Sequence, residues 1–310
     1  MAKKIIKAIL KYPLILINRI YTYFYYKNSD KKDNYLVDDM FKGENKVLVF
    51  APHVDDETIG AGGTLIRHKN RSDKIVLVYI SDGGSSTSEL SREEVVLERK
   101  NEGECLKKTL GIYNLYFLDE PDGSVNSSKE ELIEKIVQIL EIEKPDIIYT
   151  PFIVDGHRDH VETTISAIKA IEKWNSEFDS IYMYEVNSPI LPSTVNALCI
   201  MDEKLYNEKE ELYKIFTSQW AMGFSAFSLL NRRKKLIAGE GYGAEVFVKS
   251  DVEEARKALE VILERGFKPE QFKQLSSEYN LLMAYRQNSQ LKNEYNTLVD
   301  KVITEELARR

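Results

Sequence analysis

The sequence predicts an α/β protein: a three-layer sandwich with a mostly parallel sheet, preceded by an amphipathic helix and followed by a helical appendix. Four short apolar runs alternate with four segments of helical character, and this alternation is typical of a parallel sheet covered by helices on both faces. The apolar runs lie at 46–50, 74–80, 115–118 and 146–150, and the helical segments at 65–68, 92–110, 129–143 and 161–174. A hydrophobic fraction of 43% in 310 residues supports one sizeable core.

Residues 1–34 precede this alternation, and we interpret residues 3–26 as an amphipathic helix with one apolar and one mostly basic stripe. The stripes consist of Ile6, Ile9, Pro13, Leu16 and Ile20, and of Lys4, Lys7, Lys11 and Asn18. Charged residues interrupt the apolar run and Pro13 would kink the helix, so the run falls short of the ~20 residues that span a bilayer. We therefore expect contact with a membrane surface. Docking on the protein's own core or on a partner chain stays open, as does a transmembrane anchor.

Local signals predict where the elements of the central domain, residues 45–250, begin and end. The first strand stops at Ala51-Pro52, the helix at 92–110 stops at Gly111, and a turn follows at 120–123. Two later segments, 180–186 and 244–248, alternate like strands, and the chain between them is expected to be mostly helical. The appendix, residues 251–310, is charged and poor in glycine, so we expect it to be helical throughout.

Composition limits the partners and the chemistry. A formal net charge of -7 and a pI near 5.4 argue against a nucleic-acid-binding surface. The two cysteines, Cys105 and Cys199, are far apart and form no CxxC motif. We therefore expect a reducing, cytoplasmic location and no thiolate metal site. If the first helix contacts a membrane, the protein would lie peripherally on that membrane. Any metal must be held by histidine and carboxylate, and the oligomeric state is left open.

Three of the four histidines lie in two compact polar clusters, His53-Val54-Asp55-Asp56-Glu57 and Asp155-Gly156-His157-Arg158-Asp159-His160. Each cluster follows an apolar strand and precedes a helix. The loops that leave the carboxyl ends of parallel strands line one common crevice, so we expect the two clusters to meet there. The fourth histidine, His68, stands between Arg67 and Lys69 in a helix and is expected at the surface.

These residue types indicate a hydrolytic metal site. Imidazoles and a carboxylate without thiolate suit zinc with three protein ligands and an open position for water, although ligand type also permits iron. Adjacent Asp55 and Asp56 cannot easily point at one metal, so one would bind it while the other accepts the proton of the attacking water. His160, in the first turn of its helix, would be kept neutral as a metal ligand must be. His157 remains as a donor to the oxyanion.

The segment APHVDDE, followed about a hundred residues later by DGHRDH, resembles the PIG-L or LmbE-like deacetylase family. Further matching positions are 81–84, Arg99, Glu102, 110–111, 121–123, 144–146, 218–219 and 245–247, so the resemblance covers 46–248. It implies a Rossmann-like fold and zinc-dependent removal of N-acetyl groups from glucosamine-containing substrates. Carried over residue by residue, it implies that His53, Asp56 and His160 are metal ligands, that Asp55 is the general base and that His157 stabilises the oxyanion.

Two departures from the family pattern concern the substrate more than the reaction. Pro52 precedes His53, where the family has proline after this histidine, and the Ser-rich loop 83–89 lacks an arginine that relatives direct toward the sugar. The N-acetylglucosamine-type sugar could belong to a glycan, a glycolipid or a small-molecule conjugate. The alternatives are another metal-dependent hydrolase, or a non-catalytic sugar-binding member of the same fold.

Overall fold

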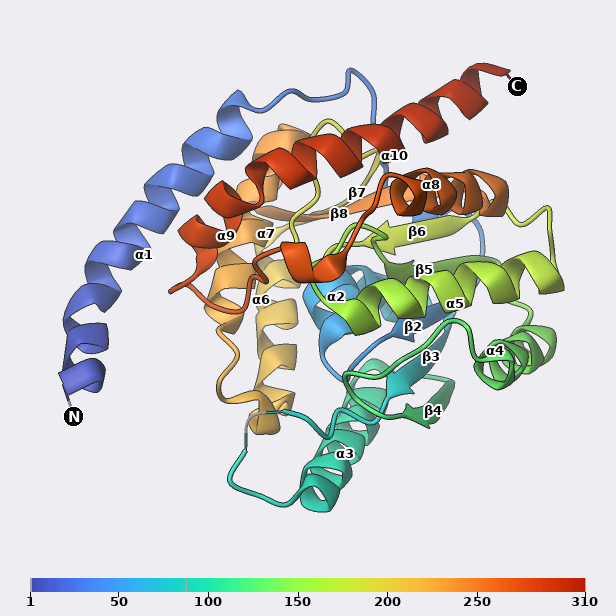
Figure 1. Ribbon diagram of the computed structural model, residues 1–310, viewed down its shortest axis with the longest axis horizontal. Helices are drawn as coiled ribbons and strands as arrows, with labels where there is room; N and C mark the ends of the chain where they lie inside the picture. The colour runs from blue at the N-terminus through green and yellow to red at the C-terminus, as the bar shows by residue number, and fades with distance from the viewer. Residues whose placement is uncertain (1, 87, 310) are drawn as a thin grey trace.

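The computed structural model describes residues 2–86 and 88–309, with side chains described from Tyr12 to Thr304 except residue 87. The strands of the described ranges form one eight-stranded sheet (Figure 1). In sheet order these are β1 (Leu36–Val37), β7 (Ala197–Met201), β8 (Gly243–Ser250), β6 (Ile181–Tyr184), β5 (Ile147–Pro151), β2 (Lys46–Ala51), β3 (Lys74–Ser81) and β4 (Asn114–Glu120). Only β8 runs antiparallel to its neighbours among the described strands. The prediction of a mostly parallel α/β sheet is confirmed.

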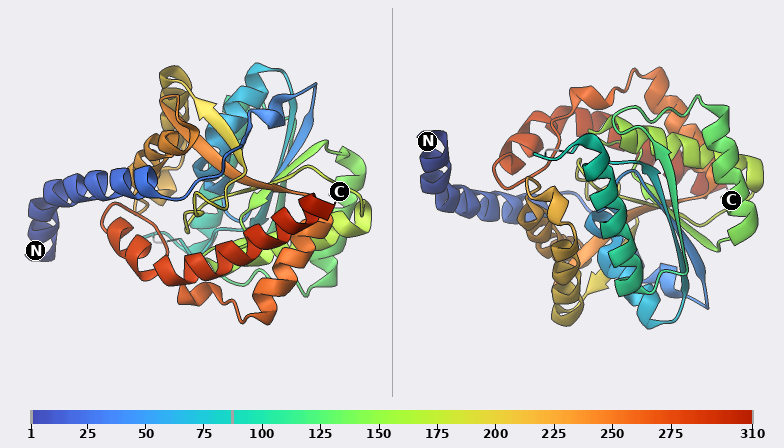
Figure 2. Two further views of the ribbon diagram at one scale, coloured as in Figure 1. Left: turned by 90° about the horizontal axis from the view of Figure 1, so that it is seen from above. Right: turned by 90° about the horizontal axis from the view of Figure 1, so that it is seen from below.

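Helices cover both faces of this sheet (Figure 2). One face carries α2 (Asp56–Asn70), α3 (Arg92–Leu110), α6 (Glu203–Leu212) and α7 (Phe224–Ala238), and the other carries α4 (Glu130–Glu143), α5 (Arg158–Trp174) and α8 (Val252–Glu264). The central strands β2 and β3 are almost entirely buried, as expected for parallel strands between two helical layers. Helix α3 begins with a capping box between Ser91 and Glu94 and ends at Gly111, whose φ of 65° favours glycine.

The chain after β8 departs from the predicted continuous helix. Helix α8 stops at Glu264, and residues 265–280 form a loop with one 3-10 turn (Pro269–Gln271) before α9 (Leu281–Gln287) and α10 (Ser289–Arg309). Gly266, with a φ of 87°, and Pro269 interrupt the helix, so the expectation of helix throughout was wrong. The segment β7 was also missed, in a region expected to be mostly helical.

His68 does not lie at the surface, and that expectation was wrong. Its side chain is fully buried on the inner side of α2. Its Nδ1 lies 2.7 Å from Oδ2 of Asp73 and its Nε2 lies 2.8 Å from the hydroxyl of Tyr149. Burial lowers the pKa of His68 to about 4, although Asp73 opposes this effect, so the imidazole is neutral.

The first helix, α1 (Ala2–Asn28), packs beside α7 and α9 and bends in its first half (Figure 2). The side chains of Lys4, Ile6, Lys7, Ile9 and Lys11 lie outside the described residues. The described part of this helix has both polar and aromatic side chains on its buried side and large apolar side chains on its exposed side. Its buried side includes Asn18, Thr22 and Tyr26, and its exposed side includes Tyr12, Leu16, Ile17, Ile20, Tyr23 and Phe24. No helix in the described ranges has both the length and the apolar character needed to cross a bilayer.

Candidate active site

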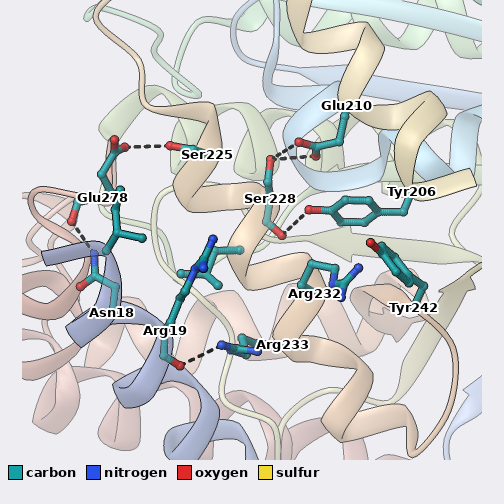
Figure 3. A pocket seen from close by; sticks show the side chains of 12 residues that line it. Asn18, Arg19, Tyr206, Glu210, Ser225, Ser228, Arg232, Arg233, Tyr242 and Glu278 are labelled. Carbon is teal, nitrogen blue, oxygen red and sulfur yellow. Dashed lines mark hydrogen bonds between the residues drawn. The ribbon is translucent and has the colours of Figure 1, made fainter. Parts of the chain in front are cut away.

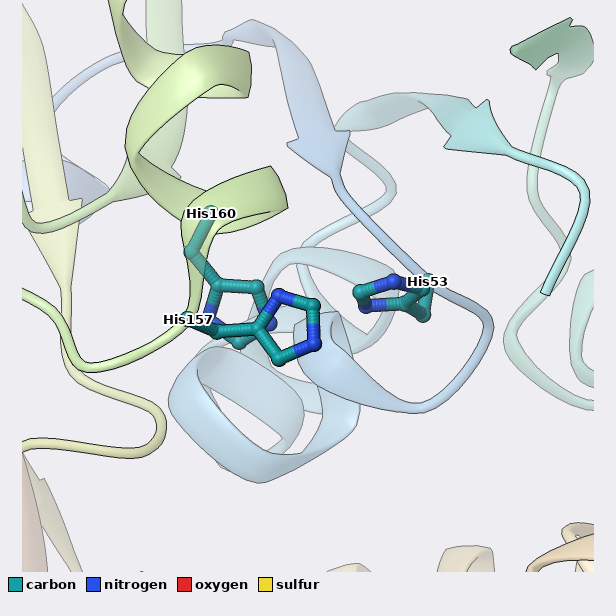
Figure 4. Close-up of side chains that lie close together, drawn as sticks. All are labelled: His53, His157 and His160. Atoms are coloured by element: carbon teal, nitrogen blue, oxygen red, sulfur yellow. The ribbon is translucent and has the colours of Figure 1, made fainter. Parts of the chain in front are cut away.

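Two polar loops meet at the carboxyl ends of β2 and β5, which are neighbours in the sheet. The first loop carries His53, and the second carries His157 and His160 into the start of α5. The three imidazoles lie close together, with ring centroids 4.9 Å apart for His53 and His157, 5.4 Å for His53 and His160 and 4.8 Å for His157 and His160 (Figure 4). The structure therefore brings together the two clusters that the sequence placed at strand ends.

Asp56 lies between two of these imidazoles. Its Oδ2 atom is 3.1 Å from Nδ1 of His53 and 3.2 Å from Nε2 of His160. Donors that each bind zinc at 2.0–2.2 Å are separated from one another by about 3–3.5 Å, so these two distances are compatible with a shared metal. Within the described residues, the donor atoms of His53, His157 and His160 also lie within 4.8 Å of one another, as do those of His53, Asp122 and Asp159.

Asp155 stabilises the second loop through contacts of both its carboxylate oxygens. Its Oδ1 accepts a hydrogen bond from the backbone N–H of His157 at 2.8 Å and lies 3.1 Å from Nδ1 of His160. Its Oδ2 accepts from the backbone N–H groups of Asn187 and Ser188. A carboxylate behind an imidazole fixes the ring and leaves the opposite nitrogen for a metal. Sequence analysis placed Asp155 in the cluster but gave it no role.

Asp55 differs from Asp56 in backbone and surroundings. Its φ of 124° is rare for a residue with a side chain, and the backbone N–H of Asp55 donates to Oε2 of Glu57 at 3.2 Å. Its Oδ1 lies 3.5 Å from Nη2 of Arg99, and its buried Oδ2 has no hydrogen-bond partner among the described residues. Asp55 therefore has one carboxylate oxygen without a hydrogen-bond partner in the described part of the chain, and it lines the same cavity as the histidines.

Buried charges set the protonation of this cluster. Burial raises the pKa of Asp55 to about 7; Arg99 opposes the rise and the Asp56 carboxylate adds to it. Burial also acts on Asp56, but His160 and His53 outweigh it and hold the pKa of this carboxyl well below its usual range. Burial opposes charge on His160, yet Asp56 and Asp155 raise its pKa to about 10. The carboxylates that favour this imidazolium would equally favour a divalent cation, which must displace the proton.

His157 is in the opposite state. Burial, together with the charges of His160 and His53, lowers its pKa to about 4, so it is neutral near pH 7. Its Nδ1 accepts a hydrogen bond from the backbone N–H of Asp159 at 3.2 Å. The proton of the neutral ring must therefore lie on Nε2, which makes His157 a hydrogen-bond donor at that atom.

A cavity of about 440 Å³ opens over these groups. Besides the histidines and the two aspartates, polar side chains dominate its lining: Ser85, Ser86, Arg99, Asp122, Asn187, Ser218, Gln219, Gln274 and Ser276. Gln274 and Ser276 come from the loop after α8 and were missed, since no motif marks them. Gln274 Nε2 donates to the carbonyl of Gly156 at 2.9 Å, which ties this loop to the second cluster. Such a lining suits a ligand rich in hydroxyl groups.

The part of the chain that carries both polar clusters resembles known proteins in sequence. Residues 48–171 match the family described as GlcNAc-PI de-N-acetylase, PIG-L. This part of the chain is therefore similar to the PIG-L family. The chain is 29% identical over 145 residues to the diacetylchitobiose deacetylase of Thermococcus kodakarensis. The match covers 45% of this chain and 54% of that protein, so it spans about half the length of its relative.

Solved structures resemble this chain in fold. The N,N'-diacetylchitobiose deacetylase of Pyrococcus horikoshii is 22% identical, with a TM-score of 0.59 over 70% of this chain and 87% of that one. The 4-carboxy-2-hydroxymuconate hydratase of Pseudomonas putida is 16% identical, with a TM-score of 0.55 over 66% and 95%. One fold thus carries both a deacetylase and a hydratase, and function must be argued from the site.

Proposed function

We propose that this chain is a metal-dependent N-deacetylase that hydrolyses the acetamido group of an N-acetylglucosamine-type sugar to acetate and a free amine. The observation that carries the proposal is the position of Asp56 Oδ2, 3.1 Å and 3.2 Å from nitrogen atoms of His53 and His160, in a cavity that Asp55 also lines. The similarity to the diacetylchitobiose deacetylase of Thermococcus kodakarensis supports the substrate class, because that name describes removal of acetyl groups from an N-acetylated sugar.

The proposed metal ligands are His53, Asp56 and His160, and the metal is zinc, with iron permitted by the same ligands. A divalent ion there would polarise the amide carbonyl and acidify water. Asp55 accepts the proton of the attacking water and passes it to the leaving nitrogen, and Arg99 keeps its carboxylate oriented. Nε2–H of His157 donates to the carbonyl oxygen as negative charge develops on it. The water oxygen ends in acetate, and the nitrogen leaves as the amine.

Measurement of acetate release tests this proposal. Purified protein would be offered diacetylchitobiose and N-acetylglucosamine in free, lipid-linked and inositol-linked form, before and after treatment with a chelator and after restoring Zn²⁺. We expect release of acetate together with an equal amount of amine, loss of activity with chelator and recovery with metal. If the metal-replete chain releases acetate from none of these compounds, the deacetylase proposal fails, and binding without turnover would favour the non-catalytic alternative.

We further propose that the exposed face of α1 lies on a membrane surface. Leu16, Ile20 and Phe24 are each about half exposed or more on this face, while polar Asn18 on the opposite side is fully buried. An interfacial helix places its apolar face among acyl chains in this way. Flotation with liposomes tests the contact: the Leu16→Ser, Ile20→Ser double variant should lose binding that the unaltered chain shows. Equal flotation of both proteins would contradict it.

A further inference from the structure

A second cavity, of about 580 Å³, lies between α1, α6 and α7 (Figure 3). Three arginines line it: Arg19 from α1, and Arg232 and Arg233 from α7. None of the groups assigned to catalysis lines this cavity. The two cavities nevertheless border the same loop, because Gln274 and Ser276 line the catalytic one and Glu278 lines the arginine one.

The positive charge in this arginine cavity is only partly offset by the described residues that line it. None of its three guanidinium groups forms an ion pair with a described carboxylate. Arg232 lies over the ring of Tyr242, 3.3 Å from its centroid, and Arg233 donates to the hydroxyl of Thr22 and the carbonyl of Arg19. Burial and then the charges of Arg19 and Arg232 lower the pKa of Arg233, the effect expected when like charges crowd together.

The two carboxylates at the edge of the arginine cavity are bound to serines instead. Glu210 accepts hydrogen bonds from the hydroxyl of Ser228, at 2.7 Å to each oxygen, and Glu278 accepts one from Ser225 at 2.9 Å (Figure 3). Three arginines share this cavity with two glutamates, which leaves a formal net charge of +1. A net positive cavity of this kind favours an anionic ligand, and planar guanidinium groups match the oxygens of a phosphate.

The arginine cavity lies at the border of the apolar face of α1. At 100° per residue, Arg19 falls between the buried arc that contains Asn18, Thr22 and Tyr26 and the exposed arc that contains Leu16, Ile20 and Phe24. A helix whose exposed arc is immersed at the level of the acyl chains would hold Arg19 at the level of the headgroups. Arg232 and Arg233, on α7 beside this helix, would then face the same layer.

We propose that the arginine cavity binds the phosphate of an anionic phospholipid while the apolar face of α1 lies on the bilayer. The proposal rests on the membrane contact proposed above and is independent of the deacetylase reaction. It assigns different parts of the affinity to two groups of residues. The apolar arc supplies burial among acyl chains, and Arg19, Arg232 and Arg233 supply the preference for negatively charged lipid.

Vesicle binding tests the assignment. Cosedimentation would compare vesicles of phosphatidylcholine with vesicles that contain phosphatidylglycerol, for the full chain and for its Arg19→Gln, Arg232→Gln, Arg233→Gln variant. The matched control is Lys100→Gln, Lys135→Gln, Lys173→Gln, which removes the same charge from α3, α4 and α5. We expect the arginine variant to bind anionic vesicles at least about tenfold more weakly, while the control stays within about threefold. Acetate release from a water-soluble substrate should be unchanged in both variants.

The outcomes separate the proposals from one another. If the arginine variant binds anionic vesicles as tightly as the full chain does, or the lysine control loses as much, the arginine cavity is not the lipid site although the contact through α1 stands. Binding of inorganic phosphate at submillimolar concentration without vesicles, lost in the arginine variant, would overturn the lipid source in favour of a soluble phosphate compound. If the full chain binds none of the vesicles, and light scattering shows that it dimerises through α1, both membrane proposals are overturned. Thermal unfolding of each variant checks that it is folded.

Discussion

Lys209 and Glu245 form a fully buried ion pair inserted into the hydrogen-bond ladder of α2. The Nζ and Oε1 atoms are 2.7 Å apart, and neither side chain is exposed. Glu245 accepts from the backbone N–H groups of Gly63 and Thr64 and from the Thr64 hydroxyl, at 2.6–2.8 Å, and Lys209 donates to the carbonyl of Ile59 at 2.9 Å. In an ordinary α-helix the N–H of Gly63 would donate to the carbonyl of Ile59. Here Glu245 accepts from that N–H and Lys209 donates to that carbonyl, so the ion pair takes the place of one helical hydrogen bond.

The two residues should therefore contribute unequally to stability. Glu245→Gln leaves the Lys209 ammonium buried without a counter-charge, and removal of one partner from a buried pair costs about 3–5 kcal/mol. Lys209→Met leaves Glu245 with three donors, so we expect a smaller loss of about 2–3 kcal/mol. The Glu245→Gln, Lys209→Met double variant should lose at least about 1 kcal/mol less than the sum of the single losses, because the unpaired charge is no longer created.

Urea unfolding followed by circular dichroism measures these free energies. The matched control is Glu260→Gln, which breaks an exposed pair with Arg256 of similar length, 2.6 Å, and should cost less than about 1 kcal/mol. A Glu245→Gln variant that unfolds within about 1 kcal/mol of the unaltered chain, or strictly additive single losses, would refute the reasoning.

Three further predictions concern the histidines and Asp55. Asp55→Asn should reduce turnover by about 10²–10⁴ while metal stays bound, because an amide cannot accept the proton of water; loss of metal in elemental analysis would make Asp55 a ligand. His160→Ala should lose metal, whereas His157→Ala should keep it and lose about 10²–10³ in rate; equal metal loss in both variants contradicts the assignment. Since the pKa of His68 falls from 6.5 to about 4 on folding, the unfolded chain binds the proton first as pH falls, and the contribution of His68 to stability should decrease by about 2 kcal/mol from pH 7 to pH 5; a His68→Gln variant with the same pH dependence as the unaltered chain would exclude this cause.

The central sheet was predictable because its strands are buried on both faces and form continuous apolar runs. Val47 to Ala51 and Ile75 to Ser81 carry no exposed residue, so their sequences show no interruption. The strand β7, with the sequence ALCIM, is equally apolar but lies between a loop, 185–196, and helix α6, in a region that was expected to be mostly helical. A five-residue apolar run in that setting cannot be distinguished from part of a buried helix by periodicity alone.

The histidine and aspartate positions were predictable for a topological reason, and the rest of the cavity was not. Parallel neighbours such as β2 and β5 bring their following loops to one edge, whatever the sequence between them. By contrast, Gln274 reaches Gly156 across 118 positions of the chain, from a loop that the sequence suggested was helix. His68 was misjudged because its charged neighbours point outward from α2, while the inner face of the same helix is buried.

The backbone at Asp55 explains how two adjacent carboxylates can serve different purposes. From the sequence, Asp55 and Asp56 were not expected to point easily at one metal, because they are adjacent in the chain. In the structure Asp56 begins α2 and lies between two imidazoles, while Asp55, at a φ of 124°, turns its carboxylate toward Arg99. Such a conformation costs about 1–3 kcal/mol and persists only where its surroundings are rigid. The buried pair of Lys209 and Glu245 joins the middle of α2 to α6 and β8, so it holds the helix from which both aspartates project.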